Sequence, residues 1–150
     1  MLIDLLATAV IIATPQTPGT NWVVAGGTAD NEMIILIDTG TMRRDSSGVS
    51  TAWVMAVNRQ RNEHGYDYVM LRKQYRCEQG DWRMIYAASY QMQGESPLVA
   101  GPVETPWEPA LPSSTAENEM DTVCADEAIR GIAGPSHEVA QLGRNVLRNR

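Results

Sequence analysis

The chain contains no phenylalanine, only two cysteines and only two histidines, so few residues are suited to metal binding or nucleophilic catalysis. Two cysteines cannot complete a four-ligand zinc site, and these two do not form a C-x-x-C pair. The G-x-S-x-G, H-E-x-x-H and P-loop patterns are also missing from the sequence. His64 falls in a polar stretch and His137 near the C-terminal tail, where solvated side chains are expected. These absences predict no catalytic residue, no cofactor and no metal site.

Positive charge is also scarce. The sequence has 12 lysines and arginines against 18 aspartates and glutamates, which gives a formal net charge of -6. Proteins that bind nucleic acid need an excess of lysine and arginine to displace counterions from the phosphates. Nucleic acid is therefore not an expected partner.

Two pairs of acidic residues are candidates for acid–base chemistry. Glycoside hydrolysis, for example, uses two carboxylates that face each other across a cleft and differ in pKa. Asp38 and Asp45 fall in turn-forming segments, where aspartate hydrogen-bonds its own backbone. Glu117 and Glu119 fall in the first turns of an expected helix, where the helix dipole favours acids. Structural roles are therefore predicted for both pairs.

The two cysteines, Cys77 and Cys124, are either free thiols or partners in one long-range disulfide, and the cellular compartment decides between these alternatives. Residues 5–13 (LLATAVIIA) form an apolar run too short to span a bilayer, which needs about 20 residues. The run has the length of a signal-peptide core, although Asp4 precedes it and no lysine or arginine does. The alternative is a buried N-terminal strand or helix. We expect export, with residues 1–20 as a signal segment and linker, and no transmembrane span.

The length of 150 residues favours a single domain, and most of it reads as strands. Residues 33–37 (MIILI) form a continuous apolar run, which is typical of a strand covered on both faces. Residues 49–57 alternate in polarity and should place their odd-numbered side chains on one face. Further strands are expected at residues 22–25, 66–77, 81–92 and 98–100. About six strands precede the helices rather than alternating with them, so the predicted class is α+β with an antiparallel sheet.

The pairing of the two longest strands, 66–77 and 81–92, can be argued from their apolar pattern. A two-residue turn at residues 79–80 would pair Cys77 with Trp82 and gather most apolar side chains of the hairpin on one face. The apolar face predicted in this register comprises Val69, Leu71, Tyr75, Cys77, Trp82, Met84, Tyr86 and Tyr90.

The other face of this hairpin is predicted to carry Arg72, Arg76 and Arg83. Local positive charge on an acidic protein can attract an acidic partner. These three arginines are therefore the candidate partner-binding residues, and an ordinary solvated sheet face is the alternative. Lys73 is a misfit on the apolar face, and we expect it to reach past a sheet edge.

A helix is predicted after residues 97–110, whose four prolines exclude a central strand. Ser114 and Glu117 form a capping-box pattern. The residues that follow place one apolar stripe on the helix, made of Met120, Val123 and Cys124.

The C-terminal region is expected to lie outside this domain. Gly131, Gly134 and Pro135 interrupt the chain, and a last helix would align Val139, Leu142 and Val146. We therefore predict a domain at residues 21–130 and a peripheral tail at residues 131–150.

Four segments occur in a characteristic order: NWVVAGG, MIILIDTGTMRRDSSGVSTAWVM, YRCEQGDWRMIYAASY and PWEPALPSSTAENEMDTVC. This ordered set, which covers about residues 21–125, resembles the surface-adhesin protein E family. No single element is specific, but the set with both cysteines in place is. The matching positions are Trp22, Asp38, Arg43, Arg44, Trp53, Cys77, Arg83, Trp107, Pro109, Pro112, Ser114 and Cys124.

The resemblance implies an antiparallel sheet backed by the C-terminal helix, a disulfide between Cys77 and Cys124, export to the bacterial envelope and no catalysis. The expected faces agree with that pairing, because both cysteines would point into the interface between sheet and helix. The adhesin after which the family is named binds host extracellular-matrix and serum proteins.

Three functional hypotheses follow. The first is an exported, non-catalytic envelope protein that acts as a protein-binding module, in the periplasm, at the cell surface or secreted, as a monomer or a homodimer. The second is a small periplasmic enzyme whose site is assembled from scattered residues. The third is a structural or inhibitory envelope protein.

Overall fold

The computed structural model describes residues 19–94 and 96–150. The expected signal segment lies almost wholly outside these residues, so export stays a prediction. The strands are β1 (Trp22–Gly27), β2 (Met33–Arg44), β3 (Val49–Asn58), β4 (Tyr68–Arg76), β5 (Asp81–Tyr90), β6 (Val99–Pro102) and β7 (Glu108–Pro109). The helices are α1 (Thr115–Val123) and α2 (Ser136–Arg148).

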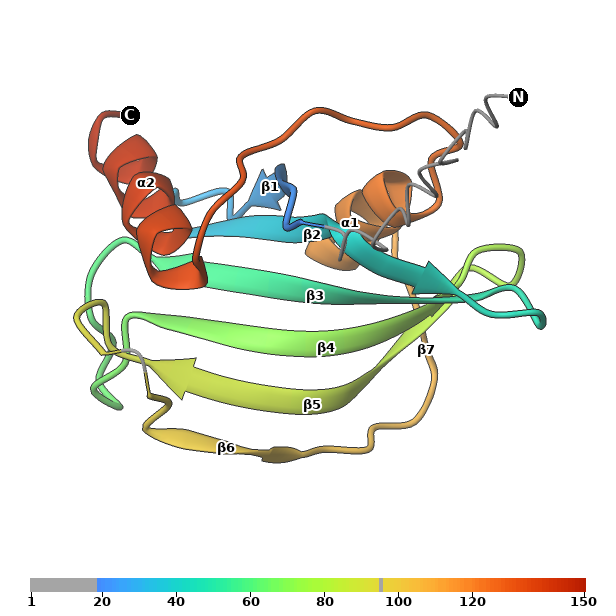
Figure 1. Cartoon of the computed structure of the whole chain (residues 1–150), viewed down its shortest axis with the longest axis horizontal. Coiled ribbons are helices and arrows are strands. Elements are labelled where there is room, and N and C mark those ends of the chain that lie inside the picture. Colours follow the sequence, from blue (N-terminus) through green and yellow to red (C-terminus); the bar gives the residue numbers. More distant parts are fainter. Residues whose placement is uncertain (1–18, 95) are drawn as a thin grey trace, which may run out of the picture.

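The strands form one antiparallel sheet in which β1 to β6 are neighbours in sequence order, and the short β7 pairs with the start of β5. Figure 1 shows the long strands β2 to β5 in the middle of the sheet. Asp45 builds the turn between β2 and β3, since its carboxylate accepts hydrogen bonds from the backbone N–H groups of Ser47 and Val49. The predicted α+β class, with an antiparallel sheet, helices at the C-terminal end and a disulfide, is confirmed.

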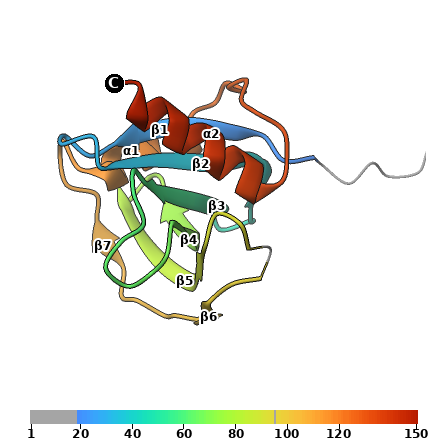
Figure 2. The same cartoon turned by 90° about the vertical axis from the view of Figure 1, so that its left-hand side faces the viewer.

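One helix packs on each face of the sheet, and we name the faces the α1 face and the α2 face (Figure 2). The core of the α1 face consists of Ile35, Ile37, Ala52, Val54, Ala56, Tyr75, Met120 and Val123. The core of the α2 face consists of Trp22, Ile34, Leu36, Met55, Val57, Tyr68, Val139, Ala140 and Leu147. The apolar run at residues 33–37 alternates between the two cores, as predicted for a strand covered on both faces.

Helix α1 begins as its sequence predicts. The Ser114 side chain accepts a hydrogen bond from the backbone N–H of Glu117, and the Glu117 carboxylate accepts one from the backbone N–H of Ser113. This reciprocal capping satisfies N–H groups that the first turn of a helix leaves without partners. The cap fixes where α1 starts and so helps to place Met120 and Val123 over the sheet.

The prediction that residues 131–150 form a peripheral tail is wrong. Ile132 pairs with Trp22 through two backbone hydrogen bonds of 2.8 Å. Helix α2 then buries Val139 and Leu147 against the sheet. The expected stripe of Val139, Leu142 and Val146 is rotated, because the last two side chains are exposed.

Gly143 gives a physical reason for this rotation. A Cβ at this position would lie 3.2 Å from Ile34 Cγ2 and 3.5 Å from Leu36 Cδ1, so a side chain here would crowd the sheet. Glycine costs a helix about 1 kcal/mol relative to alanine. In α2 the missing side chain instead lets the helix backbone approach β2 closely.

The predicted turn of the β4–β5 hairpin is wrong in length. The connection comprises residues 77–80 rather than 79–80, and Arg76 pairs with Asp81. Gly80 adopts a φ of +72°, a conformation that glycine tolerates better than other residues. The longer turn moves Cys77 out of the ladder and into the loop.

A β-bulge in β5 is the second difference between the observed and the predicted hairpin. Lys73 pairs with Met84 but Arg72 pairs with Tyr86, so Ile85 is the extra residue. Tyr86 therefore lies on the α2 face, whereas the sequence pattern places it beside Met84 on the other face. The same shift moves Tyr90 to the α2 face, where it packs against the core.

Candidate binding surface

Helix α2 covers only one end of its sheet face, the end where β3 finishes and β4 begins (Figure 1). The other end of this face carries arginine and aromatic side chains. The three candidate arginines do share this face, because residues 72, 74 and 76 alternate along β4 and Arg83 pairs opposite Gln74. We call this region the arginine–tryptophan surface, and it consists of Trp53, Arg72, Arg76, Arg83, Tyr86 and Trp107.

Trp107 is held between two of these arginines. Its ring lies 4.1 Å from Arg76 Cζ and 4.8 Å from Arg83 Cζ, measured from the ring centroid. The indole comes from the proline-rich segment after β6, which is fixed here because β7 pairs with the start of β5. Cation–π contacts of this kind each contribute about 0.5–1 kcal/mol at exposed sites.

Arg76 and Arg83 are also fixed by polar partners. Arg76 forms a two-point ion pair with the cross-strand residue Asp81. The hydrogen bond from Arg76 lowers the pKa of Asp81, and the same bond raises the pKa of Arg76. Arg83 Nε donates to Gln74 Oε1 at 2.7 Å, and its Nη1 lies 3.7 Å from Glu104. These contacts hold the guanidinium planes in place before any partner binds.

Arg72 is the most available of the three arginines. Its side chain is exposed, and its Cζ lies 5.8 Å from the ring centroid of Trp53. Trp53 in turn makes an edge-to-face contact with Tyr86 at 5.8 Å between centroids. Within the described ranges Arg72 has no ion pair, so its donors are free for an external acceptor.

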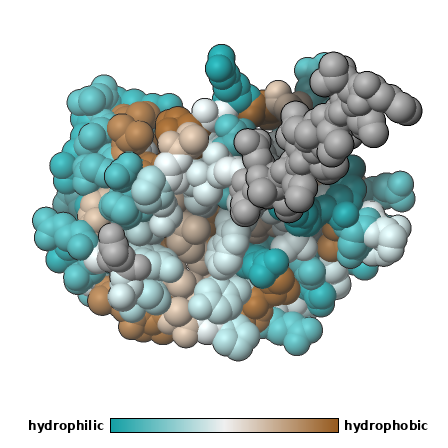
Figure 3. Space-filling model, in the orientation of Figure 1, coloured by the Kyte–Doolittle hydropathy of each residue, from teal (hydrophilic) through white to brown (hydrophobic). Residues whose placement is uncertain are grey.

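The edge strand beside this surface adds exposed apolar area. Strand β6 pairs only with β5, and its other side has no neighbouring strand in the described part of the chain. Leu98, Val99 and Val103 are 50%, 73% and 38% exposed. In Figure 3 brown, apolar residues gather at the lower margin of the molecule over β6. An unpaired edge of this kind can accept another extended segment.

The other candidates from the sequence have structural or solvent-facing positions. The Asp38 carboxylate accepts from the Asn21 backbone N–H at 2.8 Å and from the Thr41 hydroxyl at 2.6 Å, where β1 meets β2. The His64 side chain is 70% exposed, and His137 lies in the first turn of α2. Among residues 19–94 and 96–150, no three His, Cys, Asp or Glu side chains cluster as metal ligands. No helix in that part of the chain has the length and apolarity to cross a membrane.

A buried polar cluster between the sheet and α1 is absent from the sequence predictions. Lys73 Nζ contacts the two Glu119 carboxylate oxygens at 3.0 Å and 2.9 Å, and the Tyr75 hydroxyl donates to Glu119 at 2.7 Å. The expectation that Lys73 reaches past a sheet edge is wrong, because the residue is only 6% exposed. Burial, with the neighbouring Glu119 charge, raises the pKa of Tyr75 well above its usual value. Glu119 precedes Val123 by one helical turn, which places it on the buried stripe of α1.

The disulfide lies next to this cluster. Cys77 and Cys124 are bonded, with 5.7 Å between their Cα atoms. The bond joins the β4–β5 turn to the C-cap residue of α1. The pairing predicted from the resemblance is therefore confirmed, and it anchors the C-terminal end of α1 to the sheet.

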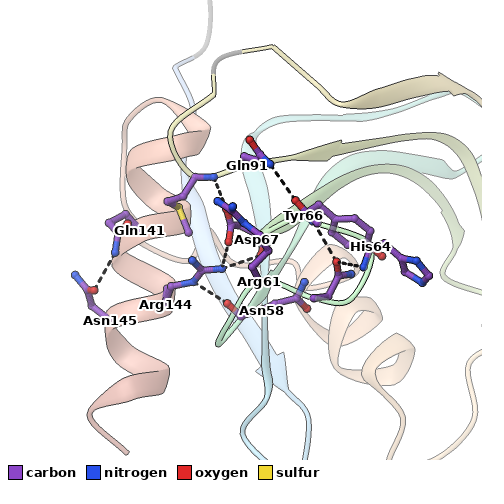
Figure 4. A network of polar contacts seen from close by, with 12 residues as sticks. Asn58, Arg61, His64, Tyr66, Asp67, Gln91, Gln141, Arg144 and Asn145 are labelled. Carbon is purple, nitrogen blue, oxygen red and sulfur yellow. Dashed lines mark hydrogen bonds and ion pairs between the residues drawn. The ribbon is translucent and has the colours of Figure 1, made fainter.

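A second polar network joins α2 to the sheet (Figure 4). The buried Asp67 carboxylate accepts from Arg144 Nη2 at 2.8 Å, from Arg61 Nη2 at 3.1 Å and from the Met92 backbone N–H at 2.7 Å. Arg144 Nε also donates to the Asn58 carbonyl at 2.9 Å. Burial would raise the pKa of Asp67, but the bonds from Arg61, Met92 and Arg144 together lower it. Nothing in the apolar pattern of α2 marks Arg144 as a buried residue.

Comparison with known proteins adds a family. The family model described as surface-adhesin protein E matches residues 22–125, which include β1 to β7, α1 and both cysteines. Helix α2 lies beyond the matched residues. No curated protein and no solved structure gives a significant match to the chain. Since the family model covers more than half of the sequence, the chain belongs to the surface-adhesin protein E family.

Proposed function

We propose that this protein is an exported, non-catalytic envelope module that binds another protein through the arginine–tryptophan surface. Membership of a family of surface adhesins supports a surface-binding role. The disulfide supports an oxidising compartment such as the periplasm or the cell exterior. Export itself rests on the apolar run at residues 5–13 and on the disulfide together.

The observation that carries the proposal is a partly exposed group of arginine, tryptophan and tyrosine, with Arg72 exposed, at the end of the sheet face that α2 leaves uncovered. These three residue types are enriched at the centres of protein interfaces, where tryptophan and arginine supply much of the binding energy. Arg76 and Arg83 are held in place by Asp81, Gln74 and Trp107, so little side-chain entropy is lost on binding.

The chemistry of the surface indicates the kind of partner. Guanidinium groups on an acidic protein favour an acidic segment, and arginine binds carboxylates in a two-point geometry. The neighbouring β6 edge could pair with the backbone of the same segment. An extended protein segment that carries aspartate or glutamate fits both features.

The buried carboxylates do not favour the enzyme hypothesis. Glu119 is saturated by Lys73 and Tyr75 inside the interface between α1 and the sheet. Asp67 accepts three donors and has 2% of its side chain exposed. Hydrogen-bonded carboxylates of this kind hold elements together, so binding is the better-supported function.

The direct test uses biolayer interferometry of the purified chain against a panel of extracellular-matrix and serum proteins. We expect saturable binding to at least one protein, and a loss of about tenfold or more in the variant R72S/R83S. The matched control is R43S/R130S, which removes the same charge from two exposed arginines elsewhere. Equal losses in both variants, or unchanged binding in R72S/R83S, would place the binding surface elsewhere. Cell fractionation with protease treatment of intact cells tests the envelope location separately.

A further inference from the structure

A pocket of about 560 Å³ lies at the opposite end of the same sheet face, between α2 and the loop that follows β3. Its walls contain four arginines and one carboxylate, that of Asp67. The pocket therefore carries three net positive charges in a chain whose formal net charge is -6. The lining residues are Arg59, Gln60, Arg61, Asp67, Arg144 and Arg148.

The carboxylate in this pocket holds its arginines in place and offers little competition for an incoming anion. Both Asp67 oxygens already accept hydrogen bonds, one from Arg144 and the other from Arg61 and the Met92 N–H. Arg144 is fixed further by its bond to the Asn58 carbonyl (Figure 4). Two guanidinium groups are thus positioned in advance, and each keeps N–H groups that Asp67 does not use.

The side chains of the other two arginines at this site, Arg59 and Arg148, have no polar contact with the described residues that assigns them a role in the fold. In the described part of the chain, the side chains of Arg59 and Arg148 make no hydrogen bond and no ion pair. Arg148 lies in the last turn of α2, where the helix dipole opposes an anion with about half a negative charge. Three net positive charges outweigh that opposition.

We propose that this pocket binds a phosphate group that carries two negative charges or more. The planar fork of arginine matches the oxygen geometry of phosphate, and several such forks converge on one concave site. The ligand is either a soluble phosphorylated molecule or the phosphorylated headgroup of a lipid. Two of the four arginines, Arg144 and Arg148, come from α2, which lies outside the residues that match the family model.

The test uses inorganic pyrophosphate as the soluble probe, followed by isothermal titration calorimetry and by amide NMR shifts. The informative variant is R59S/R148S, because both side chains are free of structural contacts and the fold should survive their loss. We expect its dissociation constant to rise by about tenfold or more. The charge-matched control R43S/R130S should bind as the unmodified chain does, and shifted amides should lie at residues 59–61 and 144–148.

A second arm identifies the source of the phosphate. Vesicles of phosphatidylcholine with and without phosphatidic acid, a phosphomonoester that can carry two negative charges, are sedimented with the same three proteins. Binding to pyrophosphate supports a soluble ligand, and binding to the anionic vesicles alone supports a lipid headgroup, provided that R59S/R148S loses it. Absence of saturable binding in both arms, or an equal loss in R43S/R130S, would overturn the proposal. The variant R72S/R83S should keep pyrophosphate binding, so this site and the proposed protein-binding surface can fail independently.

Discussion

Lys73 is the only lysine of the chain, and it lies inside the protein rather than on its surface. Its ammonium group faces the Glu119 carboxylate and lies 4.4 Å from the ring centroid of Trp82. A buried charge is costly unless it is paired and hydrogen-bonded. The pair therefore fixes α1 in one orientation on β4, whatever its net contribution to stability.

Removing one member of this pair should destabilise the protein more than removing both charges. K73M leaves the Glu119 carboxylate buried without its cation, and we expect a loss of about 3–5 kcal/mol in the free energy of unfolding. K73M/E119Q keeps an acceptor for the Tyr75 hydroxyl and removes the uncompensated charge, so most of that loss should be recovered. Urea denaturation of the two variants and of E119Q alone measures the coupling. Additive effects of the two substitutions would contradict a direct ion pair.

Single residues show where the sequence was informative and where it was not. The alternation of apolar and polar residues correctly placed Arg72, Arg76 and Arg83 on one face, because side chains alternate between the faces of a regular strand and the bulge at Ile85 lies beyond Arg83. The partner of Lys73 depends on how α1 sits on the sheet, which is a tertiary property. An unexplained lysine on an apolar face was still a usable signal, since a buried ammonium group is costly unless it is paired and hydrogen-bonded.

At the scale of elements, α2 changes the outline of the domain. The helix completes the α2 face, because Val139 and Leu147 cover Ile34, Leu36 and Val57. Without it, apolar residues at the end of β3 would face water. The glycines and the proline before α2 correctly indicated a break in the chain, but a break says nothing about whether the next element packs on the core.

Two leucines of α2 provide a matched test of its orientation. Leu147 is 1% exposed and Leu142 is 48% exposed. We expect L147A to lower the free energy of unfolding by about 2–5 kcal/mol, the range for buried leucine truncations. L142A makes the same chemical change in the same helix and should stay within about 1 kcal/mol. Equal effects in urea denaturation would mean that α2 is rotated or detached in solution.

The disulfide supports the other helix. Its cysteines are 47 positions apart in sequence, and closing a loop of this size stabilises a protein by about 4 kcal/mol in the chain-entropy model. Helix α1 is short, so the bond should account for a large part of its attachment. We expect C77S/C124S to lose about that amount in urea denaturation, and reduction of the unmodified chain to match it. A loss under about 1 kcal/mol would show that packing and the Lys73–Glu119 pair hold α1 without the bond.

The β4–β5 hairpin shows why register was the least predictable feature of the elements. A bulge at Ile85 reverses the faces of half of β5, and no glycine or proline marks that position. The bulge lets Tyr86 reach Trp53 on the α2 face while Trp82 stays near Lys73 on the α1 face. Packing on both faces of the sheet decides where such a bulge falls. The polarity pattern of a single strand does not contain that information.

At the scale of the molecule, a buried ion pair ties each helix to the sheet in the described part of the chain, Lys73–Glu119 for α1 and Arg144–Asp67 for α2. The pKa shifts at these two sites have opposite directions. Asp67 has a lowered pKa in the α2 network, and Tyr75 has a raised pKa in the α1 cluster. The two ends of the pH range should therefore weaken different helices.

Asp67 stabilises the folded state fully at pH values above its unfolded pKa of 3.8. This stabilisation is lost as the pH falls through the lower pKa that Asp67 has in the folded state. At high pH the unfolded chain releases the Tyr75 proton near its ordinary pKa of 10.0, whereas the folded chain keeps it. The folded state then binds more protons than the unfolded state, so stability falls as the pH rises above that value. The urea midpoint should accordingly be flat near neutrality and decline at both extremes.

The variant Y75F separates the decline in stability at high pH from the decline at low pH. It removes the titrating hydroxyl of the α1 cluster, so the decline above the ordinary tyrosine pKa should become shallower, while Tyr68 and Tyr90, whose pKa values burial also raises, keep part of it. The decline in acid should not change, because it comes from carboxylates with lowered pKa values, Asp67 and Asp81 among them, and not from Tyr75. Urea midpoints across the pH range, for the unmodified chain and for Y75F, measure both declines. An alkaline decline of equal steepness in the two proteins would mean that the Tyr75 hydroxyl is not held in the buried cluster with Glu119.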